Sequence, residues 1–274
     1  MTRAAGIGIA ALLAGGAAAS IAAAQEQRIW LQGYSDSDEI GAGARPFIPE
    51  GAAEDFLPPG FAALPGRKLH ILSQPGERDT ATAGEIAEGE TCGPTVGFSK
   101  PLNVKRDQRI LVSTAPISIA EAKEIPSADP KLAKGVAAYL SDKGLKKPKV
   151  AILRALQADL DGDGKPETIV EAMTKGRDLS GFFLGEKPGD FSFVAVGALS
   201  DAGFKVAAHA GYIIGLDQEH FIAAQYEIQA LPDFTGSGRF DLAVYESGYE
   251  WGGVQVFAWS DGSLKTLASS YCGA

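Results

Sequence analysis

The sequence predicts a mainly β protein, α+β overall, built of antiparallel β-meanders with one helix before them. Three observations predict this class. Short apolar runs rich in β-branched and aromatic residues recur between turn sequences in the C-terminal half. One segment has apolar residues at helical spacing. An acidic, glycine-rich loop occurs twice, each time between two strand-like runs, which indicates one supersecondary unit used twice.

Residues 1–24 have the pattern of a secretory signal peptide. Arg3 supplies a positive start, an Ala- and Gly-rich apolar run follows, and three alanines precede Gln25. The alternative is a transmembrane anchor, which the shortage of strong hydrophobes disfavours. Cleavage would leave 24 Lys and Arg against 34 Asp and Glu, a formal net charge of −10. We therefore expect a periplasmic or secreted protein without a transmembrane anchor after signal cleavage, and the acidic charge disfavours nucleic acid as a partner.

The rest of the chain divides into three predicted regions. Residues 25–66 are rich in Gly, Ala and Pro and are expected to form an irregular, linker-like segment. Residues 67–147 form a small α+β region with strand candidates at 68–72 and 109–113. Residues 148–274 form a two-repeat β domain with calcium loops.

The predicted helix spans residues near 130–143. Asp129 is a good N-cap and Pro130 suits the first helical position. The apolar residues at helical spacing are Leu132, Val136, Ala137 and Leu140. We expect this helix to lie across one end of the β unit and to cover an exposed sheet edge.

The first acidic loop, residues 159–167, reads DLDGDGKPE. Hard oxygen ligands at alternate positions suit Ca²⁺, and the glycines allow a tight bend. An EF-hand is excluded because Val170 stands where the bidentate Glu would be required. A metal-free acidic turn remains the alternative. We expect one Ca²⁺ site whose protein ligands are the side chains of Asp159, Asp161, Asp163 and Glu167 and the carbonyl of Lys165.

A second loop, residues 233–241, aligns with the first at an offset of 74, from 159 to 233. Its corresponding polar residues are Asp233, Thr235, Ser237 and Asp241. Hydroxyls are weaker calcium ligands than carboxylates, so we interpret this copy as degenerate. Its polar side chains can satisfy the turn by bonding nearby backbone groups.

These two loops and their flanking strand-like runs resemble the calcium loops of FG-GAP/VCBS-type repeats, which form blades of integrin-like β-propellers. The resemblance covers residues 148–272 and implies propeller-blade-like repeats with a calcium site in the first. The chain also resembles small exported bacterial proteins with one or two such loops and no defined activity. Glu167 replaces the more usual Asp, and the second loop lacks two carboxylates. A propeller needs four to eight blades, so we expect a two-blade β-sandwich or an open barrel.

Cys92 and Cys272 are the two cysteines of the chain. In an exported protein an even pair indicates a disulfide, whereas two free thiols remain the alternative. The spacing suits neither a zinc site nor a redox Cys-x-x-Cys motif.

No catalytic set is evident. The three histidines lack metal-ligand spacing, and no nucleophile elbow or nucleotide-binding glycine loop occurs. The carboxylates that could serve a glycosidase are Glu227, Glu246 and Glu250. Tyr249 and Trp251 share one face if the chain is extended, which makes them a candidate binding face or part of the core.

The sequence therefore favours an exported calcium-binding β-repeat protein with a structural or binding role. The alternative is an extracytoplasmic carbohydrate-active enzyme or a sugar-binding module. Its partner would be a protein or a glycan, and the residues leave the choice open.

Overall fold

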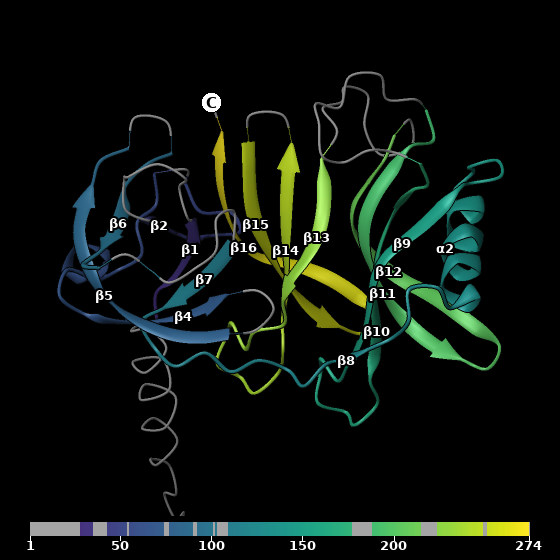
Figure 1. The fold of residues 1–274 in the computed structure, drawn as a ribbon, viewed down its shortest axis with the longest axis horizontal. Coiled ribbons are helices and arrows are strands. Elements are labelled where there is room, and N and C mark those ends of the chain that lie inside the picture. The colour runs from purple at the N-terminus through teal and green to yellow at the C-terminus, as the bar shows by residue number, and fades with distance from the viewer. Residues whose placement is uncertain are drawn as a thin grey trace, which may run out of the picture.

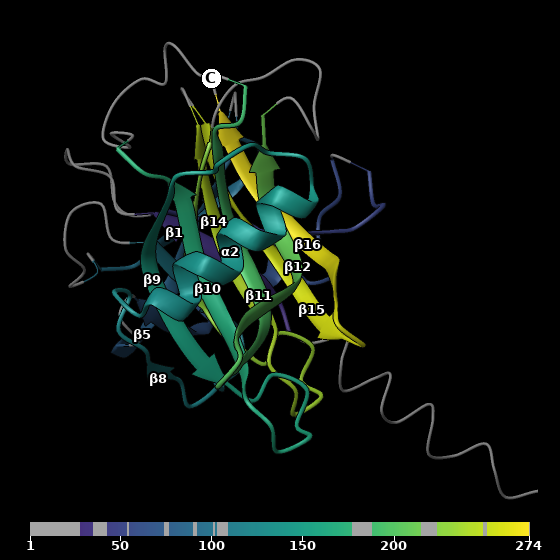
Figure 2. The same ribbon diagram turned by 90° about the vertical axis from the view of Figure 1, so that its right-hand side faces the viewer.

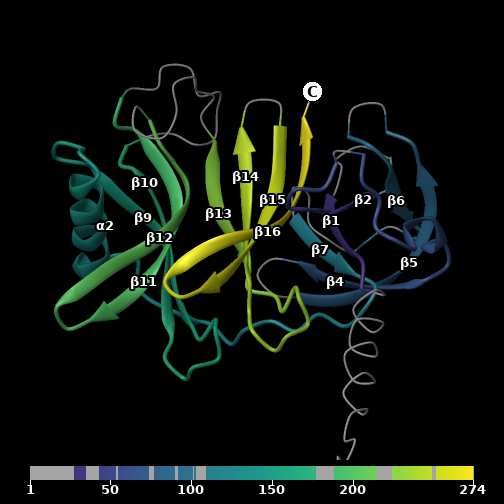
Figure 3. The same ribbon diagram turned by 180° about the vertical axis from the view of Figure 1, so that it is seen from behind.

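A computed structural model describes residues 28–34, 43–53, 55–73, 77–89, 92–100, 102, 109–176, 188–214, 224–248 and 251–273. The fold is mainly β, as the sequence predicts, with three antiparallel β systems and one α-helix in the described residues. Figure 1 shows them stacked in four layers: a barrel, a second sheet, a first sheet and the helix. The same order appears from behind in Figure 3.

The N-terminal layer is a closed barrel of six strands. In barrel order the strands are β1 (Trp30–Tyr34), β2 (Gly43–Pro46), β6 (Thr95–Phe98), β5 (Glu77–Ala87), β4 (Lys68–Ser73) and β7 (Arg109–Ser113), and β7 pairs with β1. Its interior is filled by apolar side chains such as Leu31, Leu69 and Ile110. A short 3₁₀-helix, Phe61–Ala63, places Phe61 in this core.

The expectation of an irregular segment over residues 25–66 is wrong, because β1, β2 and β3 (Ile48–Pro49) lie within it. Pro46 and Pro49 do not prevent these strands. Each stands at the end of a short strand, where a missing N–H costs little. The predicted region 67–147 is also divided differently: the barrel closes with β7, whereas the following strand and helix pack with the C-terminal β domain.

The first sheet has the strand order β12-β11-β10-β9-β8. Its strands are β8 (Lys123–Glu124), β9 (Val150–Ala158), β10 (Glu167–Thr174), β11 (Phe191–Ser200) and β12 (Gly203–Ile213). The second sheet has the order β13-β14-β15-β16-β3. It contains β13 (Gln225–Ala230), β14 (Leu242–Gly248), β15 (Trp251–Ser260) and β16 (Ser263–Gly273).

The structure contains the internal repeat. Strands β9–β12 and β13–β16 each form a four-stranded meander with the acidic or degenerate loop between the first two strands. The last hairpins match at an offset of 60, since Ser200 pairs with Gly203 and Ser260 with Ser263. Both hairpins also carry a register shift at the same place, directly after Val196 in one and Val256 in the other. The two meanders therefore share their strand order and the bulge of their last hairpin.

The two meanders pack face to face around a core that takes side chains such as Ile169 and Val194 from the first sheet and Leu242 and Trp259 from the second. The outer face of the second sheet packs on the barrel through a separate apolar cluster that includes Trp30 and Val254. Each layer therefore buries its apolar surface against its immediate neighbours.

Helix α2 (Pro130–Asp142) begins as the sequence predicts. Asp129 Oδ1 accepts a hydrogen bond from Lys131 N (2.9 Å) and Pro130 occupies the first turn. Figure 2 shows the helix lying across the outer face of the first sheet. The expectation that it covers an edge is wrong, because Leu132, Val136 and Leu140 pack on that face together with Phe193 and Phe204.

Candidate metal site

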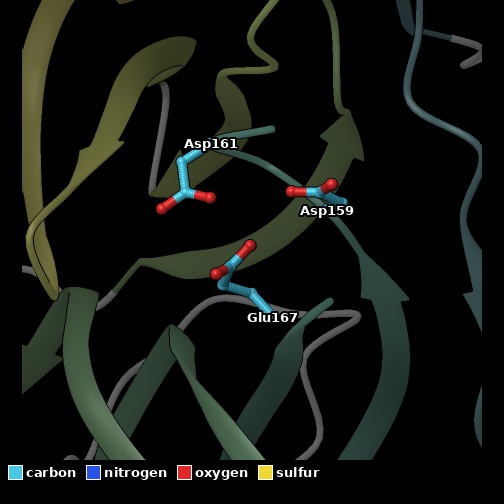
Figure 4. Close-up of side chains that lie close together, drawn as sticks. All are labelled: Asp159, Asp161 and Glu167. Atoms are coloured by element: carbon cyan, nitrogen blue, oxygen red, sulfur yellow. The ribbon is translucent and has the colours of Figure 1, made fainter. Parts of the chain in front are cut away.

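The loop between β9 and β10 gathers three of its four carboxylates. One oxygen from each of Asp159, Asp161 and Glu167 lies within 4.8 Å of the others, and all three residues are half-buried. Figure 4 shows these carboxylates facing a common space at the end of the strands. Two oxygens bound to one Ca²⁺ can be at most about 5 Å apart, twice the usual calcium–oxygen distance. The spacing and the oxygen donors of this group are therefore compatible with a bound metal ion.

Backbone amides fix the loop around Asp159. Its Oδ1 accepts from Gly162 N (2.8 Å) and its Oδ2 from Gly164 N (2.9 Å). Both glycines have positive φ, 78° and 82°, a region that side chains with a Cβ rarely adopt. The alternation of Asp and Gly therefore builds the turn and orients the carboxylates at the same time.

Leu160 anchors the loop to the core between the sheets, where its side chain is fully buried. Its backbone N–H donates to Glu167 Oε2 (2.9 Å), so the two ends of the loop are held together. Burial raises the pKa of Glu167, and the nearby Asp161 adds to this, whereas the bond from Leu160 opposes it. A cation among these oxygens would reverse the raised pKa by favouring the ionised form.

The Asp163 carboxylate is not part of this group, although the Asp163 N–H donates to Asp161 Oδ1 (3.2 Å). Asp163 Oδ1 accepts from Lys165 N (2.7 Å), and its Oδ2 lies 3.3 Å from Lys165 Nζ. The backbone hydrogen bond lowers the pKa of Asp163. Of the five predicted ligands, the structure groups Asp159, Asp161 and Glu167, and it turns Asp163 toward Lys165.

The second loop repeats the same turn. Asp233 Oδ2 accepts from Gly238 N (3.1 Å), as Asp159 does from Gly164. Gly236 and Gly238 have φ of 75° and 81°. Asp241 Oδ2 accepts from Phe234 N (3.0 Å), as Glu167 does from Leu160. Burial raises the pKa of Asp241 to about 6, and the neighbouring Asp233 contributes.

The hydroxyls of the second loop bond to each other and to the backbone. Thr235 Oγ1 donates to Ser237 Oγ (2.9 Å), which accepts from Arg239 N (3.3 Å). The two loops also meet, because Phe240 N donates to Leu160 O (2.9 Å).

The second loop has a further contact that the sequence did not indicate. The ring of Phe234 stacks on Trp30 (centroids 4.9 Å apart) and meets the edge of Phe47 (5.4 Å). Trp30 Nε1 donates to Phe234 O (2.9 Å), and Arg28 Nη1 donates to Asp233 O (2.9 Å). The loop therefore docks the second sheet on the barrel. The sequence signal for this contact was Phe234, an aromatic residue at the position that Leu160 occupies in the first loop.

Cys92 and Cys272 form a disulfide, with their Cα atoms 4.9 Å apart. The bridge joins the segment before β6 of the barrel to the last strand of the second sheet.

The predicted aromatic face is placed only in part, because Tyr249 and Glu250 lie outside the described residues, as does the predicted signal peptide. Trp251 is half-buried and meets Tyr271 edge-on (5.9 Å). Glu246 is buried and accepts from the hydroxyls of Tyr226 and Tyr271. The two phenol hydroxyls therefore orient the Glu246 carboxylate.

Glu227 lies elsewhere, at the edge of the second sheet. It forms an ion pair with Arg109 of β7, and Gln225 Nε2 donates to it. It also lines a cavity together with Glu171 and Arg154, two residues that the sequence did not single out.

Fold and site together define an antiparallel β protein with paired meanders and one acidic, cation-competent loop. Comparison with family models, with curated proteins and with solved structures gave no match. Among the described residues, no helix has the length and apolar character needed to cross a membrane.

Proposed function

We propose that this protein is an exported, calcium-binding β-repeat protein with a structural or binding role. The observation that carries the proposal is the convergence of Asp159, Asp161 and Glu167 on one space. Three partly buried carboxylates repel one another unless a cation or protons intervene. The FG-GAP/VCBS resemblance, the predicted signal peptide and the disulfide support the same proposal, since disulfides persist in extracytoplasmic compartments.

The loop sits where a cation would stabilise the fold. Leu160 connects it to the core between the sheets, and Phe240 N connects that backbone to the second loop. The second loop in turn contacts Trp30 of the barrel. Calcium bound in the first loop would therefore hold three layers in register, which is a structural role.

The test is a thermal melt of the purified protein with excess EDTA and then with millimolar Ca²⁺. A ligand that binds only the folded state stabilises it by about 2.7 kcal/mol at a hundredfold excess over Kd. We expect a rise in melting temperature of several degrees. Asp161→Ala should abolish the rise because it removes one of the three grouped carboxylates. Calorimetric titration should show the same loss of binding.

Thr235→Ala is the matched control, since Thr235 stands at the equivalent position of the degenerate loop. It should leave the calcium-induced rise unchanged. A wild-type melting temperature that is indifferent to Ca²⁺, together with no heat of binding, would refute the calcium site.

A further inference from the structure

A cavity of about 650 Å³ opens where the edges of the two sheets meet. One side is formed by β8 and the residues after it, the floor by β9 and β10, and the other side by β13. Its size lies within the range of small-molecule sites in proteins. It is separate from the acidic loop and from the Trp251 region, whose residues do not line it.

One wall of the cavity is polar and is built around Glu171. This residue is 7% exposed, and its Oε2 accepts a hydrogen bond from Ile228 N (3.2 Å). Burial raises the pKa of Glu171 to about 7, and Glu227 adds to this effect. The bond from Ile228 and the charges of Arg154 and Arg109 act in the opposite direction. Near neutral pH part of this carboxyl is therefore protonated and can donate a hydrogen bond as well as accept one.

The other charges of the polar wall are paired. Arg154 Nη2 lies 3.6 Å from Glu124 Oε1, and Arg154 Nη1 points to Ile228 O at 3.5 Å. Glu227 is paired with Arg109, which lies behind it on the barrel. The wall thus offers donors and acceptors with little net charge. Such a surface gives no advantage to a small anion or cation.

Apolar side chains complete the lining. Leu153, the neighbour of Arg154 on β9, is 41% exposed, and Ile125 and Pro126 lie along the cavity with it. A ligand that satisfies both parts of the lining has an apolar face and a rim of neutral hydroxyl groups. Pyranose rings have this character, and the volume holds one to a few of them.

We propose that this cavity binds a neutral saccharide, with Glu171 and Arg154 bonding its hydroxyls and Leu153 contacting the face of a ring. This proposal places a saccharide site at the junction of the two sheets and not at the Trp251 region. It is independent of the calcium loop, so either proposal can fail without the other.

The first test is methyl NMR of the full protein with cellotriose, maltotriose, xylotriose and chitotriose, each at millimolar concentration. At least one of these should shift the methyl signals of Leu153 and Ile125 and leave those of Leu57 in place. Leu57 is the control because its exposure, 47%, is similar to that of Leu153 and it does not line the cavity. No shift at the cavity methyls with any probe, or equal shifts at Leu57, would overturn the proposal.

Substitutions then test the polar wall with the saccharide that binds. Arg154→Met should weaken binding about tenfold or more, because it removes charged donors. Wild-type affinity should fall as the pH rises through 7, where Glu171 loses its donor proton, and Glu171→Gln should remove this pH dependence. Glu50→Gln, at an exposed site outside the cavity, should change neither property. If Arg154→Met lowers the melting temperature and so leaves its affinity uninterpretable, the pH dependence of saccharide binding by Glu171→Gln is the deciding test. A Glu171→Gln affinity that falls with pH as steeply as the wild-type affinity would contradict the proposed role of Glu171.

Discussion

At the scale of single residues, Glu171 shows how a buried carboxyl can join two sheets. Strand β13 is the edge of the second sheet, and its outward amides at Tyr226 and Ile228 need partners. The Tyr226 N–H donates to Ser192 Oγ of the first sheet (3.1 Å), and the Ile228 N–H donates to Glu171 Oε2 of the same sheet. Side chains of one sheet thus cover the exposed edge of the other, which protects it from pairing with another chain.

This arrangement predicts a pH-dependent stability. Because the pKa of Glu171 is raised from 4.5 to about 7, the unfolded state ionises first as the pH rises. The contribution of Glu171 to stability is complete below about pH 4.5, is lost progressively toward pH 7 and stays lost above it. The loss amounts to roughly 3 kcal/mol. Glu171→Gln keeps the shape and the acceptor and should remove this loss.

Urea unfolding at several pH values checks this expectation. Glu171→Gln should be more stable than the wild type at pH 8, and the difference should shrink toward pH 4.5. A difference that does not vary with pH would show that Glu171 is not a buried, titrating group.

At the scale of elements, close packing depends on positions that lack a side chain. A Cβ added at Gly135 in the middle of α2 would overlap the carbonyl oxygen of Phe204 on β12. The glycine therefore lets the helix approach the sheet closely. It also explains why a poor helix former stands on the face that carries Val136 and Leu140.

Gly135→Ala should consequently destabilise the protein. Helix propensity alone would favour alanine by up to about 1 kcal/mol. Overpacking against a rigid strand costs about 1–3 kcal/mol and should prevail. The exposed position Ala138 provides the control, where Ala138→Gly should cost only about 1 kcal/mol, the difference in propensity. A melting temperature that rises with Gly135→Ala would contradict the close approach.

At the scale of the whole molecule, the N-terminal part of the chain is held to the last strand at several points. Residues Ile48 and Pro49 of β3 pair with Ser269 and Ala268 of β16, and the disulfide lies a few residues further along the same strand. The barrel is therefore attached to the second sheet by strand pairing, by the Phe234 contact and by a covalent bond.

Reduction of the disulfide should lower stability markedly. Cys92 and Cys272 are 180 residues apart in sequence, and closing so long a loop is worth roughly 5 kcal/mol in the chain-entropy model. Thermal melts with and without reductant should show a fall of several degrees for the wild type. The double variant Cys92→Ser, Cys272→Ser should melt at the lower temperature in both conditions. Equal wild-type melts would mean that the bridge does not constrain the unfolded chain.

Much of the C-terminal fold could be predicted because its signals are local. Alternating apolar runs, the Asp129–Pro130 start and the Asp261–Gly262 hairpin need no distant partner. The barrel could not be predicted, because its first strands are short and lie among glycines and prolines. Strand β1 pairs with β7 and strand β2 with β6, and both partners lie far along the chain.

The candidate sites show the same difference between features with a local sequence signal and features that depend on distant residues. The loop motif indicated Asp159, Asp161 and Glu167 because its ligands are close in sequence. Glu171, Arg154 and Glu227 come from three strands of two sheets, and no spacing relates them. The docking role of Phe234 also depends on residues about 200 positions away.

The order of the layers differs from the order of synthesis. The chain builds the barrel first, then the first sheet and helix, and last the second sheet that lies between them (Figure 1). Until residues 225–273 emerge, the outer face of the barrel around Trp30 and Leu111 and the inner face of the first sheet both lack their cover. A nascent or truncated chain therefore exposes two apolar surfaces at the same time. Such a chain is prone to aggregate until its last strands pack between the barrel and the first sheet.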